Sequence, residues 1–144
     1  QRLLSLKGAL AVEDRQEAIL AGQDLLGLGQ GLTPSGDDML TGLFLLLGLE
    51  GSPFPEGDRL LGQIIQGRAG ETTDVSWQML TAAASGYYKQ ALVRFAQALG
   101  GPADELLPAV ERVLSIGHSS GWDILLGCLT AGELLPKYDH RIGE

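Results

Sequence analysis

Hydroxyl and carboxylate side chains gather in two short segments of this sequence that echo each other. The first begins Thr33-Pro34-Ser35-Gly36-Asp37-Asp38 and runs on to Gly42, and the second begins His118-Ser119-Ser120-Gly121-Trp122-Asp123 and runs on to Gly127. Ser, Gly, Asp, Leu and Gly match in register. Each segment follows a glycine and opens a strongly apolar stretch, so the pair predicts one helix-loop-helix unit used twice.

Helix capping is the simplest chemistry for these segments. Ser35 and Ser120 could accept hydrogen bonds from unpaired backbone N–H groups of a first helical turn. Asp38 and Asp123 would place negative charge where the helix dipole is positive. Capping therefore accounts for the serines and these two aspartates.

Capping does not account for the glycines that precede Asp37. Gly27, Gly29, Gly31 and Gly36 would let the backbone approach a phosphate or carboxylate group closely. No Gly-Lys-Ser/Thr follows and no strand is expected before the loop, so neither a P-loop nor a dinucleotide fingerprint is present.

A ligand site becomes possible if the two helix starts lie at one end of the molecule. Adjacent aspartates cannot face the same way on a helix, so one of Asp37 and Asp38 is free to point at a ligand or cation. Such a cleft would suit a substrate with amide and carboxylate groups, or a divalent cation such as Mg²⁺ held by Asp37, Asp38 and Asp123. His118 would lie beside it, although a lone histidine could equally hydrogen-bond a loop carbonyl.

A third segment, Thr72-Thr73-Asp74-Val75-Ser76, repeats the pattern of hydroxyls at a helix start. It predicts a simple cap, or alternatively a third helix that brings Thr73 and Ser76 to the same cleft. The candidate ligand-binding residues are therefore Gly31, Thr33, Ser35, Gly36, Asp37, Asp38, Thr73, Ser76, His118, Ser120, Gly121 and Asp123.

Helices must position these residues, because no convincing alternating strand pattern occurs. The sequence predicts an all-α bundle of about seven helices, one of them over Val12 to Leu26. Met39 to Leu49 and Ile124 to Leu135 are apolar on nearly every side, so both are expected at the centre of the core. Trp77 and Trp122 are expected to pack rather than to bind a ligand.

Composition narrows the classes of function. The chain has 144 residues, which fits one domain, and a net charge of −8, which argues against a nucleic-acid partner. The longest apolar run is too short to span a membrane, and the lone Cys128 is typical of a core residue in a reducing compartment, so we expect a cytoplasmic protein. Because the sequence starts with Gln1, it is expected to be the C-terminal part of a longer protein.

The chain resembles a bacterial family associated with the third, helical subunit of oxamate carbamoyltransferase in anaerobic allantoin breakdown. The resemblance rests on Gly27 to Asp38, on Thr72 to Ser76 and on Ile116 to Asp123. It implies a role in carbamoyl transfer between oxalurate and phosphate, which gives oxamate and carbamoyl phosphate, together with other enzyme subunits. It carries over no catalytic residue.

Two functions remain open at this point. One is a carbamoyltransferase component, although the basic Ser-Thr-Arg-Thr loop of the ornithine and aspartate carbamoyltransferases is absent. The other is a non-catalytic helical module for docking or small-molecule binding. Converging carboxylates in a cleft would favour the first, whereas loops filled by their own caps beside an exposed apolar face would favour the second.

Overall fold

The structure is a computed structural model that describes residues 1–49, 52 and 56–135. These residues form eight α-helices and one short 3-10 helix, without a strand among them. The expected all-α fold is confirmed. The helices are α1 (Arg2–Ala11), α2 (Arg15–Leu25), α3 (Ser35–Leu47), α4 (Gly57–Ile65), η1 (Ala69–Glu71), α5 (Asp74–Ala84), α6 (Gln90–Ala98), α7 (Ala103–Leu114) and α8 (Ser120–Leu134).

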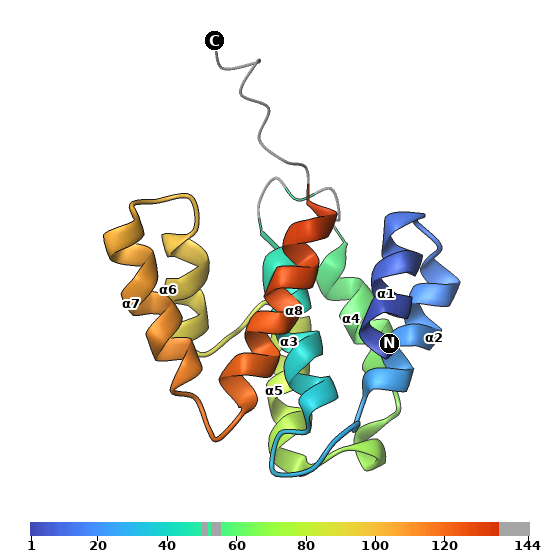
Figure 1. Cartoon of the computed structure of the whole chain (residues 1–144). Helices are drawn as coiled ribbons and strands as arrows, with labels where there is room; N and C mark the ends of the chain where they lie inside the picture. Colours follow the sequence, from blue (N-terminus) through green and yellow to red (C-terminus); the bar gives the residue numbers. More distant parts are fainter. Residues whose placement is uncertain (50–51, 53–55, 136–144) are drawn as a thin grey trace.

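Helices α3 and α8 form the most extensive helix pair and lie side by side at the centre (Figure 1). Leu40, Leu43 and Phe44 of α3 are fully buried, as the apolar pattern predicted. The two backbones approach closely because each helix has a glycine at the crossing. A Cβ atom on Gly42 would collide with the Ile124 carbonyl, and one on Gly127 would collide with the Met39 carbonyl.

The remaining helices cover this central pair from two flanks. Helices α1 and α2 pack together on one side, and α6 and α7 pack together on the other (Figure 1). Helix α4 packs on α2 and α5, and α5 also contacts α3. The flanking helices thereby hold the starts of α3, α5 and α8 in fixed relative positions.

The N-terminal part of the fold differs from the sequence expectation. Helix α1 has no counterpart among the expected helices, although Leu3, Leu6 and Leu10 are buried at helical spacing. The helix expected over Val12 to Leu26 begins only at Arg15, because Asp14 caps it by accepting from the Glu17 N–H at 3.1 Å. Val12 follows α1 instead and is exposed.

Helix α8 is not buried on every side, contrary to expectation. Trp122, Leu126 and Leu129 share one stripe of the helix and are 66%, 43% and 64% exposed. Helices α3, α7 and α1 cover the other sides of α8. The expected packing role of Trp122 is therefore wrong, whereas Trp77 does pack against the core.

In the described part of the chain, no helix combines the length and the apolar character that crossing a membrane requires.

Candidate functional site

The starts of α3 and α8 meet at one end of the molecule. The hydroxyls of Thr33, just before α3, and Ser120, the first residue of α8, lie 2.8 Å apart. The two helices run in the same direction from this contact (Figure 1). The positive ends of two helix dipoles therefore point to a common region.

The two turns resemble each other in their packing as well as in sequence. A Cβ atom on Gly36 would collide with the Leu25 carbonyl of the preceding helix, and one on Gly121 with the Val113 carbonyl. The Gly36 N–H donates to the Leu28 carbonyl at 2.8 Å, and the Gly121 N–H to the Ile116 carbonyl at 3.2 Å. Both glycines thus serve close helix packing, which supports the pseudo-repeat.

The serines do not cap these helices, contrary to expectation. Pro34 and Ser119 occupy the N-cap positions, and neither helix has a side-chain cap hydrogen bond. The hydroxyl of Ser120 pairs with Thr33 instead. The carbonyl oxygen of Pro34 accepts hydrogen bonds from the backbone N–H groups of Asp37 and Asp38.

The buried carboxylate of Asp37 accepts three hydrogen bonds from other parts of the chain. Its Oδ1 accepts the Gly27 N–H at 2.7 Å, and its Oδ2 accepts the hydroxyls of Thr72 and Ser76. The side chain has no solvent exposure. Asp37 therefore joins the end of α2 and the start of α5 to the start of α3.

Asp38 has the opposite character. The side chain is only 1% exposed, and Oδ2 accepts from the Thr33 hydroxyl at 3.1 Å. Its buried Oδ1 has no hydrogen-bond partner within the described residues. Burial raises the pKa of Asp38 to about 6, helped by the charges of Asp123 and Asp37 and opposed by the hydroxyls of Ser120 and Thr33.

A pocket of about 360 Å³ opens beside Asp38. Its floor includes the buried residues Asp38, Thr41 and Ile124, and exposed residues such as Tyr87 and Lys89 lie at its mouth. Further lining comes from Thr33, Val75, Gln78, Met79, Ala82, Tyr88, Leu92, Ile116 and Ser120. An apolar pocket with a few convergent polar groups and a perturbed carboxyl is the usual form of a small-molecule site.

Only part of the candidate set reaches this pocket. Thr33, Asp38 and Ser120 line it, whereas Gly31 and His118 are exposed elsewhere in the loops. Ser35 and Asp123 are half-buried at the helix starts but do not line the pocket.

The third segment contributes indirectly. The Thr73 hydroxyl accepts the Ser76 N–H at 3.1 Å, as the cap interpretation expected, and also donates to the Leu32 carbonyl. Ser76 is fully buried on Asp37. Thr73 therefore holds the loop before α3, Ser76 holds Asp37 in the first turn of α3, and neither residue lines the pocket.

The lining residues Gln78, Tyr87, Tyr88 and Lys89 are not among the sequence candidates. Tyr88 packs partly against the core, and burial raises the pKa of its phenol, with the charges of Asp58 and Cys128 acting in the same direction. The Tyr87-Tyr88-Lys89 cluster in a Gly-bounded loop is the signal that could have pointed to this side of the pocket.

The described residues provide neither a metal site nor a reactive cysteine. No three His, Cys, Asp or Glu side chains in the described residues are arranged to hold a metal ion, and Asp37 is already occupied by protein donors. Cys128 is buried beside the Gly42 carbonyl, and burial raises the pKa of its thiol to about 12, so it packs as a core residue, as expected.

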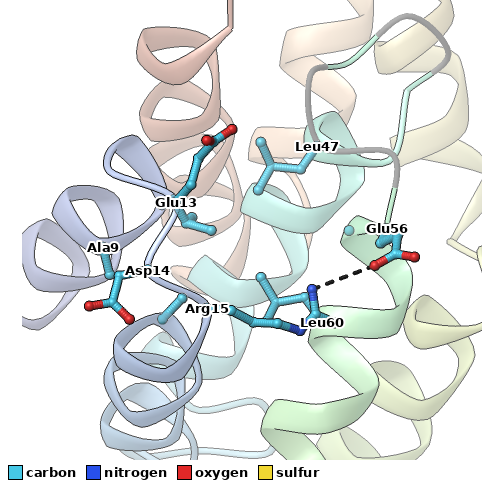
Figure 2. A pocket seen from close by; sticks show the side chains of 10 residues that line it. Ala9, Glu13, Asp14, Arg15, Leu47, Glu56 and Leu60 are labelled. Atoms are coloured by element: carbon cyan, nitrogen blue, oxygen red, sulfur yellow. Dashed lines mark ion pairs between the residues drawn. The ribbon is translucent and has the colours of Figure 1, made fainter.

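A second pocket of about 310 Å³ lies between α1, α2, α3 and α4, and it shares no lining residue with the pocket beside Asp38. Figure 2 shows acidic Glu13 and Asp14 and the ion pair of Arg15 with Glu56 around an apolar floor that includes Leu47 and Leu60. The Arg15–Glu56 pair spans 3.7 Å between exposed groups, which is a weak contact.

Replacing Asp38 by asparagine is expected to stabilise the protein above neutral pH. Between about pH 4 and 6 the folded state holds a proton that the unfolded state has released, so ionisation of Asp38 lowers stability as pH rises through that window. An amide avoids this loss, so Asp38→Asn should gain about 2 kcal/mol near pH 8 and almost nothing near pH 4. Urea unfolding at both pH values measures the difference.

Asp74→Asn is the matched control, because Asp74 is exposed in the first turn of α5. That change should alter stability by less than about 0.5 kcal/mol. An equal gain from Asp38→Asn at both pH values would contradict the assignment of a raised pKa.

The fold and the site define an all-helical domain with a polar-floored pocket at two paired helix starts. The family model of the oxamate carbamoyltransferase subunit AllH matches residues 25–132 of this chain, which include every residue that lines this pocket. The chain belongs to that family. The comparison with solved structures found no significant match.

Proposed function

We propose that this chain is the ligand-binding component of a carbamoyl-transferring enzyme, and that its pocket holds a small carboxylated amide. The observation that carries the proposal is the buried, unpartnered Oδ1 of Asp38 on the pocket floor. An ionised carboxylate can only accept hydrogen bonds, so it selects a ligand with N–H or O–H donors. The amide or ureido end of oxalurate or oxamate offers such N–H groups.

Lys89 at the pocket mouth suits the other end of such a ligand. Its ammonium group is a cation on the same pocket as Asp38, and it can pair with the ligand carboxylate. The carboxylate end would thereby stay away from Asp38, which would otherwise repel it. A pocket with a carboxylate on its floor and a cation at its mouth suits a ligand that has N–H donors at one end and a carboxylate at the other.

The chain is proposed to bind and orient rather than to attack. Cys128 is buried with a raised pKa, and His118 is exposed and does not line the pocket. The reaction of phosphate with the carbamoyl group is therefore proposed to need groups from partner subunits, in keeping with the family's description as a subunit.

Calorimetric titration of the intact protein with oxalurate and with oxamate tests this proposal. Asp38→Asn and Lys89→Gln should each weaken binding roughly tenfold or more, because each removes a charge-assisted contact. Arg94→Gln is the control, since Arg94 is exposed on α6 and does not line the pocket. Absence of binding by the wild type, or equal binding by all variants, would overturn the proposal.

A second candidate function follows from the exposed stripe of α8. Trp122, Leu126 and Leu129 form an apolar face that a docking module would use. Reconstitution with candidate partner subunits separates the two functions through the formation of carbamoyl phosphate from oxalurate and phosphate. If Asp38→Asn leaves that activity unchanged while Leu129→Ser abolishes subunit association, the docking function should replace the binding function.

A further inference from the structure

The pocket beside Asp38 is larger and more apolar than a carboxylated amide alone requires. Its volume of about 360 Å³ lies in the range of pockets that enclose drug-sized molecules. Oxamate and oxalurate consist almost entirely of polar groups, so they have nothing to place against an apolar wall.

One face of α5 supplies much of that wall. Val75, Met79 and Ala82 recur at helical spacing along α5, and all three line the pocket. Ile124 of α8 lies across the floor beside them and is 2% exposed. Thr33, Asp38 and Ser120 lie where α3 and α8 begin. Gln78 of α5 and the hydroxyl of Tyr88 add polar groups to the same pocket.

We propose that the pocket takes amphipathic amides or ureido acids, in which an N–H donor head reaches Asp38 and an apolar side group lies along the α5 face. The inference rests on the proposed function for the position of the ligand's head group. It adds that the ligand also has an apolar side group. The buried Oδ1 of Asp38 requires a donor, and the surrounding apolar surface gains by losing contact with water.

A series of N-carbamoyl amino acids tests the inference, because every member has the same ureido and carboxylate groups. Binding of N-carbamoylglycine, N-carbamoylalanine, N-carbamoylvaline and N-carbamoylphenylalanine to the intact protein is measured by calorimetry. Affinity should rise roughly threefold for each buried methylene. The phenylalanine derivative should bind at least about tenfold more tightly than the glycine derivative.

Two variants locate the two ends of the ligand. Ala82→Leu fills the apolar part, so it should remove the advantage of the phenylalanine derivative, whereas Arg94→Gln, outside the pocket, should leave the whole series unchanged. Asp38→Asn should weaken the whole series by a similar factor. Circular dichroism of each variant verifies the fold, and the comparison within the series in the wild type needs no variant at all.

The outcomes separate this inference from the function on which it rests. Equal affinities across the series in the wild type would contradict the proposal that an apolar side group lies along α5. The proposed binding of a carboxylated amide would be unaffected by that result. Binding that rises with side-group size but ignores Asp38→Asn would be simple hydrophobic adsorption, and it would overturn the inference. No binding by any member would overturn this inference, and the function itself would fail as well only if oxalurate and oxamate also do not bind.

Discussion

Asp37→Ala is expected to lower the free energy of unfolding by about 4 kcal/mol. The buried carboxylate accepts the Gly27 N–H and the hydroxyls of Thr72 and Ser76, and alanine leaves all three donors without a partner. Each hydrogen bond to a charged group contributes about 1.5 to 3 kcal/mol, and removal of the buried carboxylate recovers part of that sum through its lost desolvation cost. Urea unfolding of the wild type and the variant measures the change.

Two variants show whether the effect arises from this network. Asp74→Ala, at an exposed first-turn position of α5, should cost less than about 1 kcal/mol through the helix dipole alone. Thr72→Val removes one donor and should cost an intermediate amount. If Asp37→Ala costs no more than Asp74→Ala, Asp37 does not hold the helices together as described.

Gly127→Ala is expected to cost about 3 kcal/mol, because α3 and α8 cannot separate without loosening the centre of the core. The added methyl group would collide with the Met39 carbonyl, a backbone group that no rotamer change can move away. The measurement is the urea midpoint with the slope monitored, since an unchanged slope shows that the variant still unfolds from a native state.

Gly132→Ala is an ideal comparison within the same helix. An added Cβ at Gly132 meets nothing within 4 Å, so alanine should stabilise α8 by about 0.5 to 1 kcal/mol through its higher helix propensity. Opposite signs for the two substitutions are therefore expected. A loss at Gly132 similar to that at Gly127 would contradict the assignment of the Gly127 cost to close packing, because an added Cβ at Gly132 has no atom to collide with.

Local patterns in the sequence were sufficient for much of the fold. The apolar run of α3 predicted its burial, because a helix without a polar face must be covered on all sides. The shared Ser-Gly-x-Asp turns predicted that two helices begin alike, since glycines at equivalent positions permit equivalent backbone contacts. The stripe of Leu3, Leu6 and Leu10 carried the signal for α1, which periodicity alone could have revealed.

The division of roles between neighbouring aspartates needed the tertiary structure. Asp37 and Asp38 are chemically identical and adjacent, yet one meets donors from Gly27, Thr72 and Ser76 while the other keeps an unpartnered oxygen. Those donors come from segments whose approach depends on the packing of α2 and α5. Nothing local to the sequence decides which carboxylate they reach.

The sequence by itself determined an all-helical chain in which two hydroxyl- and aspartate-rich turns begin two apolar helices. Only the tertiary structure decided that these turns meet, that α8 leaves Leu129 exposed, and that Lys89 shares a pocket with Asp38. The physical reason is that helix formation depends on residues a few positions apart, whereas a pocket is formed by surfaces that come together only when the whole core packs.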